Sequence, residues 1–155
     1  MKLNRKIRSR SFLKPMKRGA LVLALATASL QANADVFQQI IDNVVARELV
    51  TCGVASQVSK AKTYTTTIKA DGSWSDINYS SISQTNWPAI AHLDRLKALA
   101  VAYVAPGSEL KGNEEIYNQI VNGLNYWYAK KPTSTNWYNW EIGWPQRMGV
   151  ILCLM

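Results

Sequence analysis

The amino-acid sequence predicts an all-α fold. Apolar residues recur at spacings of three and four through several stretches of roughly 14 to 18 residues, which is the period of an amphipathic helix. Segments containing glycine, proline or asparagine separate these stretches. Outside one ambiguous segment, no stretch has the alternation or the β-branched composition typical of a strand. We therefore expect helices that pack against one another through their apolar faces.

The first helix is expected from about residue 36 to about residue 49, with Asp35 available as its N-cap. The apolar stripe of this helix consists of Phe37, Ile40, Ile41, Val44, Val45 and Leu49. The segment Thr51-Cys52-Gly53 ends the helix, because glycine readily adopts the left-handed conformation found after helix C-termini.

The stretch from Val54 to Ile68 is ambiguous when only its residues are considered. Its apolar positions fit a helix, whereas the run Thr63-Tyr64-Thr65-Thr66-Thr67 is rich in residues that favour strands. A polar segment of about 15 residues follows, and a loop of this length usually has either a function or internal packing. We expect Trp74 and Trp87 to anchor this loop in the core.

The third helix is expected to start at Asn86-Trp87-Pro88, with Thr85 or Asn86 as its N-cap and the proline in its first turn. Its apolar stripe continues to Val104, and the segment Ala105-Pro106-Gly107 stops it.

The fourth helix has clear signals at both ends. Asn113 can cap its N-terminus, and the acidic pair 114–115 suits the positive end of the helix dipole. The pair Lys130-Lys131 before Pro132 suits the negative end. We then expect a loop over 133–144 and a final helix opened by Pro145.

The charge distribution argues against a nucleic-acid partner despite a formal net charge of +8. Eight of the 18 Lys and Arg residues precede Gly19, whereas all ten Asp and Glu residues occur from Asp35 onward. Residues 35–155 therefore carry no net charge and no basic patch that would attract phosphates.

The first 34 residues have the order of a secretory signal peptide. A basic segment precedes an apolar stretch over 19–30, which is followed by Gln31-Ala32-Asn33-Ala34. The apolar stretch is shorter than the roughly 20 residues that a membrane-spanning helix needs. We expect cleavage after Ala34 and a secreted or periplasmic protein with no membrane contact after cleavage.

Cys52 and Cys153 are the only cysteines. Export would permit a disulfide between them, although Cys153 lies in an apolar run and is better explained as a small buried hydrophobic residue. Two thiols and one histidine are too few for a zinc site. No metal or other cofactor is expected.

The run Asn136-Trp137-Tyr138-Asn139-Trp140-Glu141-Ile142-Gly143-Trp144-Pro145-Gln146 places four aromatic rings among amide and carboxylate groups. Such surfaces bind sugars, because the C–H faces of sugar rings lie against aromatic planes while hydroxyls bond to neighbouring polar groups. A packed core would use fewer polar groups among its aromatic residues. The alternation around Gly143 nevertheless indicates that Trp140, Ile142 and Trp144 point inward.

This run resembles the signature of the family 8 polysaccharide lyases, which cleave hyaluronan, chondroitin and xanthan. The segments 70–77, around Asp71-Gly72-Ser73-Trp74, and Thr85-Asn86-Trp87 followed by His92-Leu93 resemble two further family segments in the same order. The resemblance covers about residues 36–155. It implies a helix over 54–68 and an incomplete α/α toroid consisting of the first helical hairpins of the N-terminal domain.

The resemblance implies β-elimination at a uronic acid, with catalytic Asn, His and Tyr residues beyond Met155. No catalytic residue is therefore expected in this chain, and His92 is expected to be structural. The implied substrate-binding residues are Asn136, Trp137, Tyr138, Asn139, Glu141 and Gln146. Glu141 has two other roles of equal weight, capping a helix or pairing with Arg147.

The expected protein is thus the truncated N-terminal part of a secreted, monomeric lyase, with a signal peptide over 1–34 and a partial toroid over 35–155. Its partner would be an acidic polysaccharide. Truncation would leave Val150, Ile151, Leu152 and Leu154 exposed on the final helix. Two alternatives are a stand-alone glycan-binding helical module and an exported helical protein with no role in carbohydrate binding.

Overall fold

Every regular element that the structure describes is a helix. The computed structural model describes the backbone of residues 18–155 and the side chains of residues 35–155. The helices are α1 (Arg18–Thr51), α2 (Val54–Thr67), α3 (Ile90–Val104), α4 (Glu114–Lys130), η1 (Asn139–Gly143) and α5 (Trp144–Leu154). The all-α prediction is confirmed. The predicted signal peptide lies outside the residues whose side chains are described.

The chain divides into two units, Met1–Gln38 and Gln39–Met155, and α1 runs through the boundary. This helix begins at Arg18, well before the expected start at residue 36. Its expected apolar stripe is only partly buried, because Phe37 and Ile40 are exposed whereas Val45 and Leu49 pack against the core. Among the residues with described side chains, no helix is long and apolar enough to cross a membrane.

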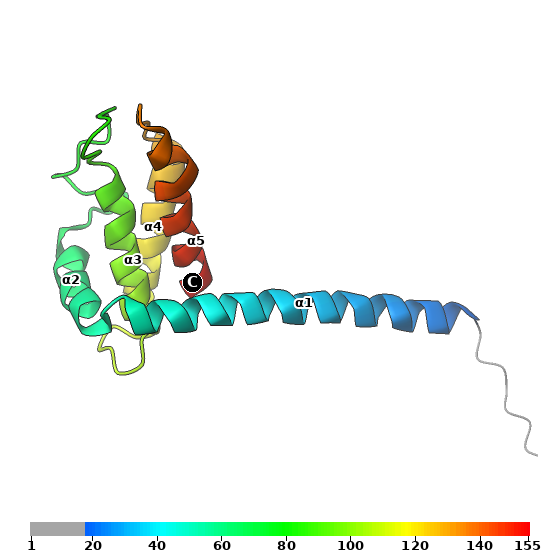
Figure 1. Ribbon diagram of the computed structural model, residues 1–155. Helices are drawn as coiled ribbons and strands as arrows, with labels where there is room; N and C mark the ends of the chain where they lie inside the picture. Colours follow the sequence, from blue (N-terminus) through cyan, green and yellow to red (C-terminus); the bar gives the residue numbers. More distant parts are fainter. Residues whose placement is uncertain (1–17) are drawn as a thin grey trace, which may run out of the picture. The chain divides into compact units, whose positions relative to one another are not determined.

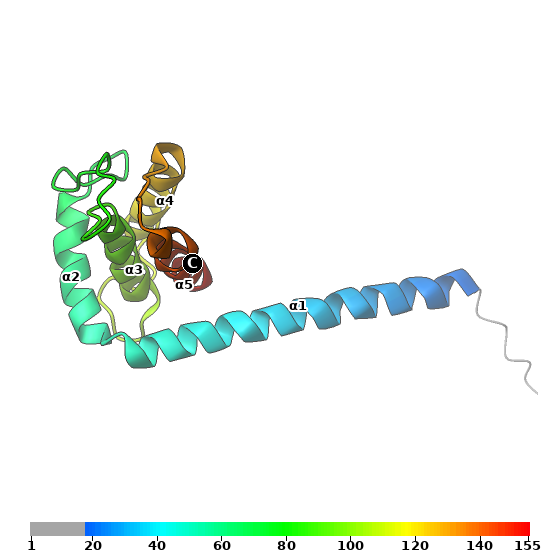
Figure 2. The same ribbon diagram turned by 45° about the horizontal axis from the view of Figure 1, so that its top comes forward.

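Helix α3 forms the centre of the second unit and packs against α2, α4 and α5 (Figures 1 and 2). Its leucines at 93, 96 and 99 are fully buried, as are its residues 100 to 102. A helix in the middle of a bundle must be apolar on most of its surface, and α3 has this composition. The core of the unit therefore surrounds α3.

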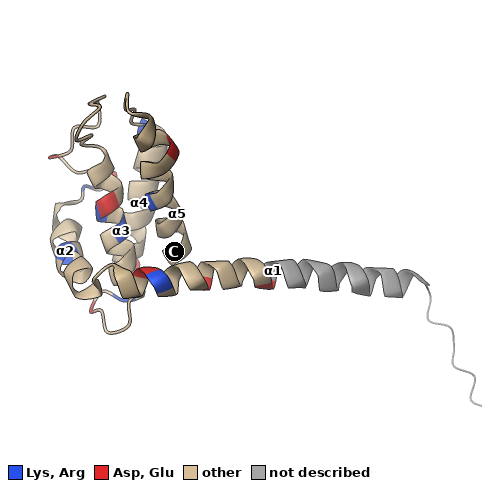
Figure 3. Cartoon of the chain, viewed as in Figure 1, with Lys and Arg blue, Asp and Glu red and all other residues tan. Residues whose placement is uncertain are grey.

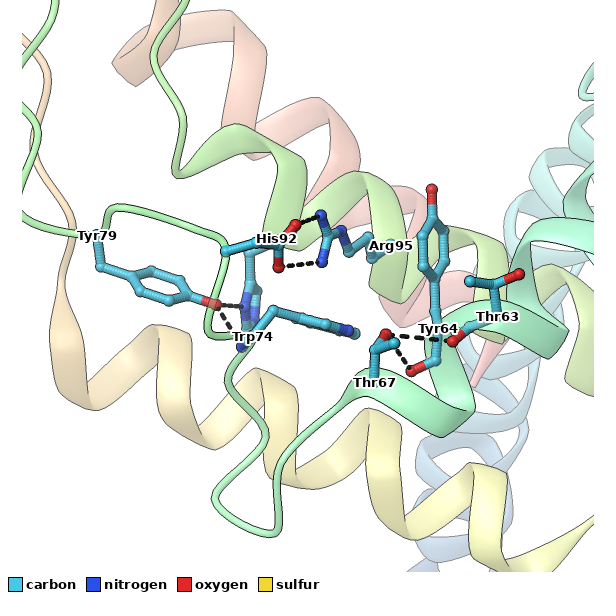
Figure 4. Close-up of polar contacts among 8 residues, drawn as sticks. Thr63, Tyr64, Thr67, Trp74, Tyr79, His92 and Arg95 are labelled. Carbon is cyan, nitrogen blue, oxygen red and sulfur yellow. Dashed lines mark hydrogen bonds and ion pairs between the residues drawn. The ribbon is translucent and has the colours of Figure 1, made fainter.

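Helix α2 is regular although its sequence contains a threonine-rich run. The hydroxyls of Thr65, Thr66 and Thr67 donate to backbone carbonyls three or four residues earlier, as Figure 4 shows for Thr67. These bonds satisfy the hydroxyls inside a helix. Packing of α2 against α3 then outweighs the strand preference of the threonines. The helix implied by the family resemblance is confirmed.

Helix α3 starts at Ile90, four residues after the predicted start. Asn86 has a φ of 52° and lies outside the helical region. The backbone from 87 to 92 then forms tight turns, in which the N–H groups of Ile90 and His92 donate to carbonyls three residues earlier. Helix α4 matches its prediction, since the Asn113 side chain accepts hydrogen bonds from the backbone N–H groups of residues 115 and 116.

The predicted loop before Pro145 is instead largely helical. After a short helical turn at 137–138, a π-helix spans Asn139–Gly143, and α5 follows directly. The N–H of Trp144 donates to the carbonyl of Asn139, five residues earlier. Pro145 has no N–H to donate, and its ring would clash with a carbonyl in a regular helix, so the wider turn occurs where the ladder must change.

Helix α5 is less exposed than expected. Of the four residues expected to be exposed, Leu152 is 60% exposed, whereas Ile151 and Leu154 are buried and Val150 is half-buried. Burial of Ile151 and Leu154 follows from the packing of α5 against α3, which the sequence did not indicate.

Candidate functional site

The Asp71-Gly72-Ser73-Trp74 segment belongs to a loop that packs closely against helix α4. Asp71 Oδ1 accepts hydrogen bonds from the Ser73 backbone N–H at 3.0 Å and from the Ser73 hydroxyl at 2.7 Å. These two bonds hold the pKa of Asp71 below its usual value. Gly72 has a φ of 85° and lies so close to α4 that a Cβ would be 2.3 Å from the backbone carbon of Asn122. The segment therefore has a structural role in this loop.

A buried hydrogen-bond chain connects the same loop to α3 and α4, and Figure 4 shows the part of it formed by Trp74, Tyr79 and His92. The backbone N–H of Trp74 donates to the Tyr79 hydroxyl at 3.1 Å, and this hydroxyl lies 2.9 Å from His92 Nδ1. His92 Nε2 lies 2.9 Å from the carbonyl of Gly123. Because a carbonyl only accepts, Nε2 carries the proton and Nδ1 accepts from the tyrosine.

His92 is therefore held neutral inside the core. Burial lowers its pKa to about 4, although the bond to Gly123 opposes that shift. Burial also raises the pKa of Tyr79 to about 12. The side chain of His92 is fully buried, so neither ring nitrogen can reach a substrate. Trp74 and Trp87 are 1% and 3% exposed, which confirms that both anchor the loop in the core.

Arg95 is committed to internal contacts beside this chain. Its guanidinium makes a two-point ion pair with Asp76, at 2.8 and 2.5 Å, and lowers the pKa of that carboxylate. It also lies over the rings of Tyr64 and Trp74, at 5.2 and 5.4 Å from their centroids. These contacts orient the guanidinium toward the loop and aromatic core.

The two loops that carry the sequence motifs lie side by side, although about 50 residues separate them. The Ser134 hydroxyl donates to the carbonyl of Ser83 at 3.1 Å, and the amide of Asn136 donates to the carbonyl of Gln84 at 3.0 Å. The indole N–H of Trp87 closes the turn of its own loop by donating to the carbonyl of Ser81. Figure 1 shows the two loops together beyond the ends of α3 and α4.

The aromatic pair, which we define as Trp137 and Tyr138, directly follows the segment that contacts the neighbouring loop. The side chains are 63% and 46% exposed, and their ring centroids are 6.2 Å apart at an interplanar angle of 77°. Asn136 Oδ1 accepts a hydrogen bond from the backbone N–H of Tyr138 and so fixes the turn from which both rings project. Two adjacent rings are thus presented to solvent from a braced backbone.

The other predicted binding residues, Asn139, Glu141 and Gln146, lie in different environments. Asn139 is half-buried, and its amide donates to the Ser134 hydroxyl at 2.7 Å. Glu141 is exposed, and the alternative in which it pairs with Arg147 is wrong, because Arg147 Nε bonds to Asp94 at 2.6 Å. Gln146 lines a small polar pocket of about 180 Å³ together with Glu48, Asp94, Lys97, Arg147 and Val150.

Two residues expected to point inward are more exposed than predicted. Trp140 is 37% exposed and Ile142 is 41% exposed, because the π-helix changes the angle at which successive side chains project. Trp144 is half-buried. The inward prediction is therefore wrong for Ile142 and only partly right for Trp140.

An apolar groove of about 520 Å³, which was not predicted from the sequence, lies between α4 and α5. Trp140 and Trp144 line one part of it. The other lining residues are Leu124, Asn125, Trp127, Tyr128, Lys131, Pro132, Met148 and Leu152. The signal was present as apolar pairs four residues apart, Leu124 with Tyr128 and Met148 with Leu152, which share a helix face.

Within residues 35–155, no three His, Cys, Asp or Glu side chains are grouped so that they could hold a metal ion. Cys52 and Cys153 are half-buried free thiols, and burial raises the pKa of Cys52. The disulfide that export would permit is not formed in this structure.

Comparison with known proteins gives consistent matches over most of the chain. The family model for the N-terminal alpha-helical domain of polysaccharide lyase family 8 matches residues 29–155. The chondroitinase-AC of Pedobacter heparinus is 38% identical over 89 residues, which cover 57% of this chain and 13% of that protein. The xanthan lyase of a Bacillus species is 28% identical over 102 residues, covering 56% of this chain and 11% of the relative.

A solved structure of chondroitinase AC lyase, from a study of its complexes with oligosaccharides, has the same arrangement of helices. It superposes with a TM-score of 0.69 at 32% identity, over 76% of this chain and 17% of that one. The chain thus spans less than a fifth of the length of each of these relatives.

Proposed function

Because this chain belongs to polysaccharide lyase family 8, we propose that it forms the N-terminal part of a secreted polysaccharide lyase and helps to bind the substrate. The substrate class is a polysaccharide containing uronic acid, of the chondroitin, hyaluronan or xanthan type. Relatives named chondroitinase-AC, xanthan lyase and hyaluronate lyase support this class. The enzyme acts as a monomer, and its signal peptide is residues 1–34.

The observation that carries the proposal is the exposure of the aromatic pair. Burying an aromatic side chain stabilises a folded protein, yet Trp137 and Tyr138 leave 63% and 46% of their surfaces in water. Their backbone is braced by Asn136, so the rings are presented from an ordered turn. Ordered aromatic planes next to amide groups suit the apolar faces and hydroxyls of sugar rings.

We assign sugar contacts to Asn136, Trp137, Tyr138, Asn139, Glu141 and Gln146. The aromatic pair stacks on sugar rings, and exposed Glu141 lies one helical turn beyond it. Gln146 contributes from its polar pocket. Asn136 and Asn139 already use part of their amide capacity inside the protein, so they contribute their remaining donors and acceptors.

The reaction of the whole enzyme is β-elimination. A base removes the proton on C5 of the uronate, the bond to O4 breaks, and an acid protonates the leaving oxygen. This chemistry needs a group that neutralises the uronate carboxylate, together with the base and the acid. His92 is excluded from these roles by its burial, and residues outside this chain supply them.

The test compares Trp137→Ala with Trp74→Ala and with an exposed control, Tyr117→Ala, in binding to chondroitin and hyaluronan oligosaccharides. Tyr117 is 41% exposed and lies on α4, outside the aromatic pair. We expect Trp137→Ala to weaken binding at least about tenfold, equivalent to about 1.4 kcal/mol, with little change in melting temperature. Trp74→Ala should instead lower the free energy of unfolding by about 3 to 5 kcal/mol.

Equal loss of binding in Trp137→Ala and Tyr117→Ala would contradict the proposal. So would a wild-type chain that binds neither oligosaccharide.

A further inference from the structure

We infer that Ser134 is a positioning residue that sets the orientation of the aromatic pair from both sides. The inference rests on the proposed function, since the orientation of the pair matters for binding only if the pair holds sugar. Ser134 lies in the segment between α4 and the aromatic pair, and it is a polar side chain buried to 8% exposure. It makes no contact with the proposed ligand itself.

The Ser134 hydroxyl uses its full hydrogen-bonding capacity. It donates to the carbonyl of Ser83 at 3.1 Å. It accepts from the backbone N–H of Asn136 at 3.1 Å and from the side-chain amide of Asn139 at 2.7 Å. A hydroxyl has one donor and two acceptor sites, so all three are occupied.

These partners flank the aromatic pair in the sequence. Asn136 directly precedes Trp137, and Asn139 directly follows Tyr138. The carbonyl of Ser134 also accepts a hydrogen bond from the Trp140 indole N–H at 2.9 Å. One residue therefore fixes the backbone before the pair and two side chains after it, so the rings between them have a restricted set of orientations.

The hydrogen bond from Ser134 to Ser83 connects the segment that carries the aromatic pair to the rest of the fold. Ser83 lies in the loop that Trp87 anchors in the core. Loss of the hydroxyl would leave the Ser83 carbonyl, the Asn136 N–H and the Asn139 amide without this partner. Buried polar groups that lose their partners rearrange or bind water, and either response changes the turn that carries the pair.

If Ser134 only satisfied hydrogen bonds within its own loop, the expected experimental result would differ. Its removal would lower stability without changing the orientation of Trp137 or the affinity for sugar. The adjacent Thr133 offers a matched control, because it is an exposed hydroxyl residue in the same segment.

The experiment uses the 155-residue chain with Ser134→Ala, Thr133→Ala and Ser134→Thr. Affinity for a chondroitin oligosaccharide is measured together with the indole ¹H–¹⁵N resonance and heteronuclear NOE of Trp137, which is assigned by its absence in Trp137→Phe. We expect Ser134→Ala to weaken binding at least tenfold, to shift the Trp137 resonance and to lower its NOE, while the Trp74 resonance stays in place. Thr133→Ala should behave as wild type, and Ser134→Thr should bind within about threefold of wild type.

Two further variants keep the inference testable if Ser134→Ala does not fold. Asn139→Ala and Trp140→Phe each remove one bond to Ser134, and each should shift the Trp137 resonance. An unshifted resonance in Ser134→Ala, or in both of these variants, would overturn the inference. A shifted resonance with unchanged affinity, or equal losses in Ser134→Thr and Ser134→Ala, would overturn it too.

Failure of the proposed function gives a different result. If the wild-type chain binds no acidic oligosaccharide, the proposed function fails, whereas the resonance measurements still decide whether Ser134 orients the pair.

Discussion

His92 shows how burial decides the role of a residue whose type alone suggests catalysis. As the only histidine of the chain, it is the natural candidate for an acid or a base. Its ring is instead fully buried, accepts from Tyr79 and donates to Gly123, and aromatic rings surround it. The neutral form of the ring is therefore part of the core.

The first prediction concerns acid stability. The pKa of His92 falls from 6.5 to about 4 on folding, so the unfolded chain binds the proton more tightly. The contribution of neutral His92 to stability is complete above pH 6.5 and is lost as pH falls toward 4. We expect the free energy of unfolding to fall by roughly 2 kcal/mol between pH 7.5 and pH 5, measured by urea unfolding.

His92→Gln is the control for this prediction, because glutamine can donate and accept hydrogen bonds but does not titrate. This variant should be less stable at pH 7.5 but should lose little further stability by pH 5. Equal pH dependence in both proteins would show that other groups cause the loss. The pKa values of Asp71 and Asp76 are lowered from the ordinary value of 3.8. The stability that these carboxylates contribute is therefore present throughout this pH range and is lost only as pH falls below about 4.

At the scale of the elements, helix ends followed the sequence where local chemistry determined them. Asn113 caps α4 as its position indicated, and Lys131 adopts the left-handed conformation before Pro132. The start of α3 and the helical turn before Pro145 depended instead on backbone geometry around a proline. Asp35, the predicted cap of the first helix, instead lies inside α1, and Ala89 rather than Thr85 or Asn86 precedes α3, so a capping residue marked the start of a helix correctly only for α4.

The second prediction concerns the contact of the Gly72 loop with α4. Gly72→Ala would place a methyl group 2.3 to 2.4 Å from the backbone of Asn122 and Gly123, at a φ of 85°. Gly107 has a similar φ of 78° but no atom within 4 Å of a Cβ. We expect Gly107→Ala to cost about 1 to 2 kcal/mol from backbone strain, and Gly72→Ala a further 2 kcal/mol or so from overlap.

Thermal or urea unfolding of both glycine variants measures the difference directly. Similar losses of stability in the two variants would mean that the loop moves away from α4 at little cost.

At the scale of the whole molecule, charge provides little long-range attraction for an acidic substrate. Acidic and basic residues are interspersed along the described helices (Figure 3). Within residues 35–155, ion pairs join Lys62 to Glu109, Arg95 to Asp76, Lys97 to Glu48 and Arg147 to Asp94. Under the proposed function, we therefore expect binding by this part of the protein to depend mainly on short-range contacts at the aromatic pair.

The third prediction is that export removes residues 1–34. The basic, apolar and small-residue order of this segment fits the requirements of the export machinery. The intact mass of protein from the medium or periplasm should correspond to a chain that starts at Asp35. A secreted chain that retains Met1 would contradict this expectation.

The fourth prediction is that the 155-residue chain has no lyase activity on chondroitin, hyaluronan or xanthan. Elimination requires a base, an acid and a group that neutralises the carboxylate around one sugar, and the sole histidine is buried. The assay follows the rise in ultraviolet absorbance from the unsaturated uronate, with an intact family member run in parallel. Turnover that disappears in His92→Ala would refute both the prediction and the structural role of His92.

The sequence by itself determined the helical class, the cap of α4, the anchoring of Trp74 and Trp87, and the family. These features depend on periodicity, local capping and motifs, which short segments contain in full. Tertiary structure decided which side chains are exposed in the run from Trp137 to Trp144, and it brought Ser134 to Ser83. Those outcomes depend on a π-helix and on contacts between segments about 50 residues apart, and local sequence patterns contain no information about such distances.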